Sequence, residues 1–169
     1  ALPRAMAKTG VPVASVGNLE TYGVLTGITG QEQRAQALEV FSRMYAPAIG
    51  AGPVLDYLWQ TGQDALKGAD ILKTVPGQYT SDVEFGGDPT GQGMRSISMV
   101  HLADLGTRVF MTTTPYNLFD THANQADPHS TLWKNISRAV TDFYSDVTSR
   151  DHNQEILIMM FTEFGRRVR

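Results

Sequence analysis

The chain contains no cysteine among its 169 residues, which excludes disulfides, thiolate metal sites and catalysis by a thiol. This absence does not fix the cellular compartment, because many exported bacterial proteins also lack cysteine. No apolar run approaches the roughly 18 residues of a membrane span, and no signal peptide is visible. We therefore expect no membrane-spanning helix in this sequence.

Several short signatures of catalysis and binding are also absent. The sequence has no Gly-x-Ser-x-Gly nucleophile elbow and no His-Glu-x-x-His pattern. The glycine-rich stretch 86–89 lacks the lysine of a phosphate-binding loop. A net charge of −3 does not favour nucleic acid as a partner, since the only dense basic cluster is Arg166, Arg167 and Arg169. That cluster is either a solvated chain end or an anion-binding group.

The composition fits a globular protein with many turns. Hydrophobic residues make up 41% of the chain and charged residues 18%, and the 16 glycines indicate loops and tight turns rather than disorder. The sequence begins at Ala1 rather than Met, and it stops soon after a strongly apolar segment. We interpret residues 1–169 as a single partial α/β domain with both ends cut.

Periodicity predicts alternating helices and strands. Helical spacing is expected over 31–45, 53–72, 93–105 and 131–147, and strands over 11–16, 108–113 and 155–161. The last strand is a continuous apolar run, typical of a strand buried on both faces. Residues 74–92 are expected to form a long loop, either lid-like or a simple connection. The expected fold is a mostly parallel sheet with helices on both faces.

Chemistry-bearing residues follow two of these strands. In open α/β sheets ligands sit at the carboxyl ends of the strands, so the segments after 113 and after 161 should share one edge. Asp120 and His122 lie two positions apart, so in an extended segment both side chains would point the same way. This pair suits a divalent metal such as zinc or manganese, and it equally suits a general base. His129 could join them as a ligand or support them.

The second segment offers a carboxylate and a guanidinium. Glu163 and Arg166 follow the apolar strand, where charges are costly unless they are paired or used. One interpretation is a structural ion pair. The other makes Glu163 and Arg166 catalytic, with Arg166 contacting an anion through its planar fork.

The sequence from about Gly91 to Arg169 resembles the bacterial domain-of-unknown-function family 1501. The resemblance rests on Leu-x-Asp-Leu-Gly-Thr-Arg-Val-Phe at 102–110, Phe-Asp-Thr-His-Ala-Asn-Gln at 119–125 with His129, Phe-Tyr-x-Asp at 143–146, and Met-Phe-Thr-Glu-Phe-Gly-Arg-Arg-Val at 160–168. It implies an alkaline-phosphatase-like fold, a two-metal site using Asp120 and His122 with Glu163 nearby, and export, often by a twin-arginine signal. Asn117-Leu118 stands where the family often has two glycines. The family's amino-terminal glycine-rich strand and its Asp-His-Gly segment are missing, so a complete two-metal centre is not expected from this chain alone.

We therefore expect part of a metal-dependent hydrolase of phosphate or sulfate esters, acting on a small anionic ester in the periplasm or outside the cell. The alternative is a non-catalytic exported or cell-surface binding domain with the same fold. For residues 1–169 alone we expect little or no turnover. A sheet edge left open by truncation would also favour self-association.

Overall fold

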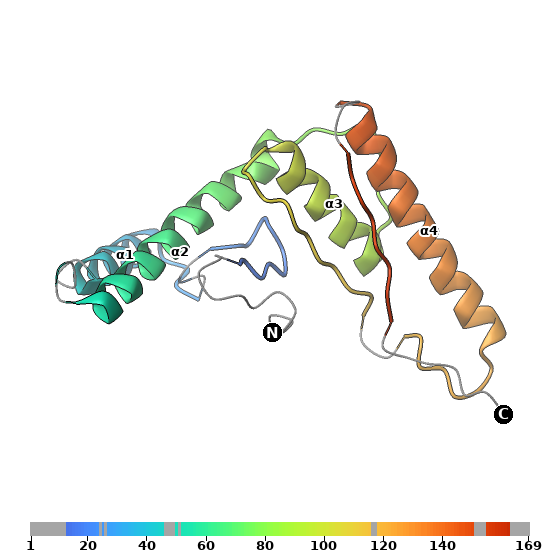
Figure 1. Ribbon diagram of the computed structural model, residues 1–169, viewed down its shortest axis with the longest axis horizontal. Coiled ribbons are helices and arrows are strands. Elements are labelled where there is room, and N and C mark those ends of the chain that lie inside the picture. The colour runs from blue at the N-terminus through green and yellow to red at the C-terminus, as the bar shows by residue number, and fades with distance from the viewer. Residues whose placement is uncertain are drawn as a thin grey trace.

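Four helices form the regular part of the protein. The computed structural model describes residues 13–23, 25, 27–45, 50, 52–115, 118–150 and 155–162. Within these ranges lie α1 (Gln31–Tyr45), α2 (Pro53–Gln78), α3 (Pro89–Leu102) and α4 (Ala126–Thr148). Figure 1 shows α1 at one end of the molecule, α3 and α4 at the other, and α2 running between them.

The predicted parallel sheet is wrong for the described part of the chain, which contains no strand. Two of the predicted strands, 108–113 and 155–161, are extended and nearly straight (Figure 1), but neither forms a β-ladder with another described residue. The expected strand at 155–161, buried on both faces, is wrong: the segment forms no ladder with another described residue and its residues are exposed. Pairing requires a second backbone about 4.8 Å away, which a local pattern cannot supply. Of the predicted strand 11–16, residues 13–16 have no regular structure and the rest lies outside the described residues.

Each of the four predicted helices is present, but the ends of most of them differ from the predicted ends. The prediction for 31–45 is confirmed by α1, whereas α2 runs beyond residue 72 to Gln78 and includes Pro76. The helix α3 begins at Pro89 because the Asp88 side chain accepts hydrogen bonds from the backbone N–H groups of Thr90 and Gly91. The predicted loop 74–92 thus shrinks to the connection 79–88.

This connection packs tightly against the start of α3. A Cβ on Gly91 would lie 2.4 Å from the backbone oxygen of Gly86, so only glycine allows this approach. Gln92 Nε2 donates to the same Gly86 oxygen at 2.9 Å. From the other side, Arg138 Nη2 of α4 donates to the backbone oxygen of Glu84 at 3.0 Å. The connection is therefore held between α3 and α4.

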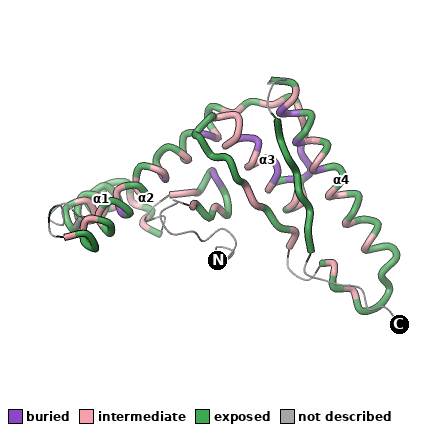
Figure 2. The backbone as a smooth tube through the Cα atoms, viewed as in Figure 1, coloured by how far each residue is buried: buried purple, intermediate pink, exposed green. Residues whose placement is uncertain are grey.

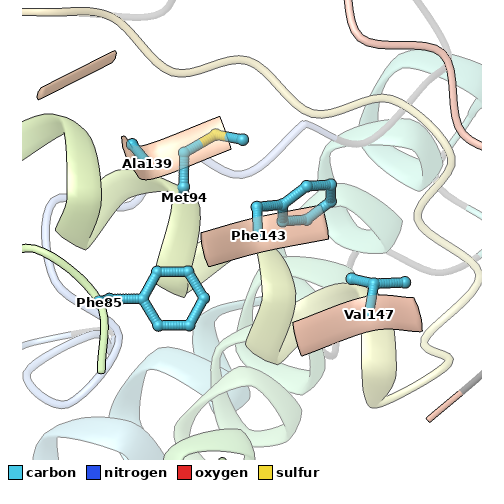
Figure 3. Packing of buried hydrophobic residues seen from close by; sticks show 5 residues of the cluster. All are labelled: Phe85, Met94, Ala139, Phe143 and Val147. Atoms are coloured by element: carbon cyan, nitrogen blue, oxygen red, sulfur yellow. The ribbon is translucent and has the colours of Figure 1, made fainter. Parts of the chain in front are cut away.

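The main core lies between α3 and α4 (Figure 2, Figure 3). It consists of Phe85, Met94, Ala139, Phe143 and Val147. The α4 members recur every four residues, which places them on one face of the helix. A second cluster of Leu19, Val75 and Met99 joins the amino-terminal loop, α2 and α3.

A buried carboxylate lies beside this core. Asp146 of α4 is 1% exposed, and it accepts a hydrogen bond from the Tyr79 hydroxyl at 2.7 Å and from the Ser81 hydroxyl at 2.5 Å. Arg150 Nη2 lies 3.6 Å from the same carboxylate. Tyr79 and Ser81 lie in the connection 79–88 and Arg150 lies just after α4, so Asp146 holds the connection against the end of α4.

Burial beside Asp146 also changes the ionisation of Tyr79. Burial, followed by the hydrogen bond to Asp146, raises the pKa of Tyr79 from 10.0 to about 12. The phenol therefore stays protonated as a donor to a higher pH than an exposed tyrosine would. The guanidinium carbons of Arg95 and Arg150 lie 5.7 and 5.3 Å from the centre of its ring.

Replacing Asp146 with alanine should destabilise the fold strongly. The change removes the acceptor of two hydroxyl groups and leaves Arg150 without its buried partner, so we expect a loss of about 3 kcal/mol in the free energy of unfolding. Urea unfolding monitored by helical circular dichroism measures this loss. The matched control is Glu39→Ala, which breaks an exposed pair with Arg43 in α1 and should cost roughly 0.5 kcal/mol or less. Equal losses in the two variants would contradict the central role of Asp146.

The pH dependence of stability should report on Tyr79. The pKa of its phenol is raised on folding, so its contribution is fully present below pH 10 and is lost as the pH rises towards about 12. We expect Tyr79→Phe to be less stable than the wild type at pH 7, with the two unfolding free energies converging above pH 10. Tyr57→Phe, at an exposed position of α2, should leave the pH profile unchanged. A constant difference between Tyr79→Phe and wild type across this range would overturn the assignment.

Candidate functional site

The predicted Asp–His pair forms in the segment that precedes α4. His122 Nε2 lies 3.2 Å from Asp120 Oδ1, as the two-residue spacing predicted. The side chain of Asp120 is 41% exposed and that of His122 is 88% exposed. Both groups are thus accessible to an ion or a small molecule from solvent.

The separation of the two atoms suits a shared metal ion. A nitrogen and an oxygen bound to one tetrahedral Zn²⁺ at about 2.0–2.2 Å lie roughly 3.3 Å apart. The observed 3.2 Å is close to that value, so the two side chains could take one ion between them with little rearrangement. The same 3.2 Å also fits a direct hydrogen bond in which the carboxylate orients the imidazole, so the pair remains either two candidate metal ligands or a general-base pair.

An aromatic cluster fixes the segment that carries this pair. Phe119 makes edge-to-face contacts with the rings of His129 and Trp133, with centroids 5.7 and 5.8 Å away. His129 and Trp133 lie one turn apart on α4, so Phe119 attaches the segment to the beginning of that helix. Because Phe119 precedes Asp120 in the chain, the cluster positions the carboxylate.

His129 serves this cluster. Its Nε2 accepts a hydrogen bond from Trp133 Nε1 at 2.9 Å, which places the ring proton on Nδ1. Nδ1 is buried and has no hydrogen-bond partner among the described residues. Neither ring nitrogen offers a lone pair to a metal in this arrangement. Of the two roles predicted for His129, ligand and support, the geometry favours support.

The remaining predicted site residues, Glu163 and Arg166, lie outside the described residues. Within the part that the structure describes, no group of three or more His, Asp or Glu side chains is arranged to hold a metal. The Asp120–His122 pair is therefore an incomplete site here.

Two other features were less visible in the sequence. The ring of His101 contacts that of Phe110 edge-to-face, with ring centroids 6.2 Å apart, and its Nε2 is buried and unpartnered within the described ranges. A cavity of about 300 Å³ lies beside the Asp146 centre. It is lined by Tyr79, Ser81, Val83, Glu84, Phe85, Gln92 and Arg95. Its two charged side chains, Glu84 and Arg95, have opposite signs. Glu84 comes from the connection 79–88 and Arg95 from α3, and no local sequence motif links the two.

Removing the Phe119 ring should loosen the segment that carries the pair. We expect Phe119→Ala to speed hydrogen exchange of the amides around Asp120 by about tenfold, because the ring contacts to α4 are lost. The helical signal should not change. Leu118→Ala, at the exposed neighbouring position, is the matched control and should exchange like the wild type. Unchanged exchange in Phe119→Ala would show that the cluster does not hold the segment.

Comparison with known proteins adds a family but no relative of known activity. Residues 59–169 match the model of a family described as "Protein of unknown function (DUF1501)". The match begins in α2, upstream of Gly91 where the motif resemblance begins, and it includes α3, α4 and the Asp120–His122 pair. No curated protein and no solved structure matches the chain. No helix among the described residues is long and apolar enough to cross a membrane.

Proposed function

The chain belongs to the DUF1501 family, and from this premise we propose that it forms part of a metal-dependent hydrolase of phosphate or sulfate esters. The proposal includes the relation to alkaline phosphatases and sulfatases, and the exported location, that the motifs at 102–125 and 160–168 imply. It concerns the chemistry of the site and not the parallel sheet expected from the sequence.

The observation that carries the proposal is the 3.2 Å contact between His122 Nε2 and Asp120 Oδ1. A carboxylate oxygen and an imidazole nitrogen are the donor set of many zinc and manganese sites. Bound there, a metal would polarise the ester oxygen and stabilise the charge that develops on it. The His122 side chain is 88% exposed, so a substrate could reach it from solvent.

The surrounding residues would keep the pair in place. The Phe119 ring, set against His129 and Trp133, limits the movement of the adjacent Asp120 carboxylate. Such support matters because the affinity of a metal site depends on the residues that orient its ligands. Catalytic zinc usually has three protein ligands, so the proposal needs at least one more. Glu163 is the candidate that the sequence offers, with Arg166 as the anion contact.

Metal affinity tests the proposed site. We expect calorimetric titration with Zn²⁺ and Mn²⁺ to show at least tenfold weaker binding for Asp120→Ala and for His122→Ala than for the wild type. Binding should also weaken as the pH falls and the imidazole is protonated. Glu39→Ala, which removes an exposed carboxylate outside the family match, is the control and should bind like the wild type. Equal affinities in all four proteins would rule out this metal site.

Activity separates the hydrolase from a binding domain. In a protein that carries this segment together with the missing metal ligands, 4-nitrophenyl phosphate or 4-nitrophenyl sulfate should be hydrolysed when metal is added, and the rate should fall more than tenfold in His122→Ala and after chelation, whereas residues 1–169 alone should show little or no turnover. Metal binding that depends on the pair without hydrolysis of either ester would favour the alternative, an exported or cell-surface binding domain.

A further inference from the structure

The cavity of about 300 Å³ beside Asp146 is not used by the proposed hydrolase. It lies near the carboxyl end of α4, whereas the Asp120–His122 pair precedes the other end of that helix. Its wall comes from the connection 79–88 and from α3. Its volume is at the lower end of the range found for ligand pockets, so a ligand that fits it has to be small.

A cation lines this cavity without an anionic partner. Arg95 of α3 is partly buried, and within the described part of the chain its guanidinium forms no ion pair and no hydrogen bond. It lies over the ring of Tyr79, with the guanidinium carbon 5.7 Å from the ring centre. A guanidinium presents five N–H donors in a planar fork that matches a carboxylate. Arg95 therefore offers a place for the anionic group of a ligand.

The side of the cavity next to Asp146 offers hydrogen-bond acceptors. Tyr79 and Ser81 line the cavity, and both donate their hydroxyl protons to the Asp146 carboxylate, which can only accept. Ser81 Oγ also accepts a hydrogen bond from the backbone N–H of Val83 at 3.0 Å. A hydroxyl oxygen has two lone pairs, so each of these two oxygens retains an acceptor site. A ligand group that meets this side has to be a donor.

Glu84, from the same connection, adds a negative charge to the wall. Its carboxylate is exposed and forms no ion pair with Arg95 or with any other described residue. The cavity is thus lined by one negative and one positive side chain that do not neutralise each other. Val83 and Phe85 add apolar surface. The wall therefore suits a ligand with a cationic donor, an anionic group and a small apolar part.

We propose that this cavity binds a small zwitterion, a molecule that carries both an ammonium and a carboxylate group, such as a free amino acid with an apolar side chain. The carboxylate pairs with Arg95, and the ammonium donates to Glu84 and to the Tyr79 hydroxyl oxygen. A ligand with both charges leaves neither charged side chain unpaired. A simple anion such as phosphate leaves Glu84 unpaired and is repelled by it. The bound zwitterion links the connection 79–88 to α3.

Three compounds of similar shape test whether both charges are needed. L-Leucine has both groups, 4-methylpentanoate lacks the ammonium, and 3-methylbutylamine lacks the carboxylate. In titrations followed by the amide signals in NMR spectra at pH 7, L-leucine should bind with a Kd of about 1 mM or tighter, and each analogue at least tenfold more weakly. Inorganic phosphate should bind no better than 4-methylpentanoate. No binding of L-leucine, or equal binding of all these compounds, would overturn the proposal.

Substitution of each charged side chain tests which ligand group it contacts. Arg95→Gln and Glu84→Gln should each weaken the binding of L-leucine at least tenfold. Arg95→Gln should not change the binding of 3-methylbutylamine, and Glu84→Gln should not weaken that of 4-methylpentanoate, because each analogue lacks the group that the substituted side chain contacts. The controls Glu39→Gln and Arg43→Gln alter an exposed pair in α1 and should bind L-leucine like the wild type.

The analogues also separate a lost contact from a lost structure. A deformed cavity would weaken the binding of every compound to a similar extent, whereas a lost contact weakens only the compounds that make it. Unchanged binding of L-leucine in Arg95→Gln or Glu84→Gln would show that the amino acid does not bind in this cavity. An equal loss of all three compounds in both variants would contradict the assigned contacts.

Discussion

The burial of one carboxylate constrains the whole α3–α4 half of the protein. A charged group as deeply buried as Asp146 has to be hydrogen-bonded, so Tyr79, Ser81 and Arg150 must reach it together. Tyr79 and Ser81 lie in the connection after α2, and Arg150 lies just beyond the end of α4. Once the three are in place, the connection 79–88 can place Phe85 in the core between α3 and α4. Polar and apolar packing are thus two parts of one arrangement.

The candidate site depends on the same helix at its other end. Asp146 and the core residues Ala139 and Phe143 fix the carboxyl-terminal half of α4, and the helix carries that orientation to its first turns. There His129 and Trp133 hold the ring of Phe119, and Phe119 sets the position of Asp120. The position of the exposed Asp120–His122 pair therefore depends on the buried Asp146 carboxylate at the opposite end of α4.

The sequence could predict what depends on neighbouring residues. Helical spacing located α1 and α4, and the two-residue spacing brought Asp120 and His122 together. It could not predict the role of Asp146, whose hydroxyl donors lie 67 and 65 residues earlier in the chain. Strand pairing failed for the same reason, since an apolar run such as 155–161 shows that a segment is extended but not what lies beside it. The cap at Asp88 and Pro89 was a readable local signal, but it was assigned to a loop.

The helix α2 has a consequence for how the two ends of the molecule are related. The family match begins inside it, at Trp59, and α1 contacts its amino-terminal side while α3 contacts its other end. The helix α2 has 26 residues, and each residue of an α-helix adds about 100° of rotation and 1.5 Å of length. The angular setting of α1 relative to α3 and α4 is therefore fixed by the number of residues in α2. A residue inserted in the middle of α2 would therefore rotate α1 about the helix axis relative to α3 and α4. A residue inserted in a surface loop would not have this effect.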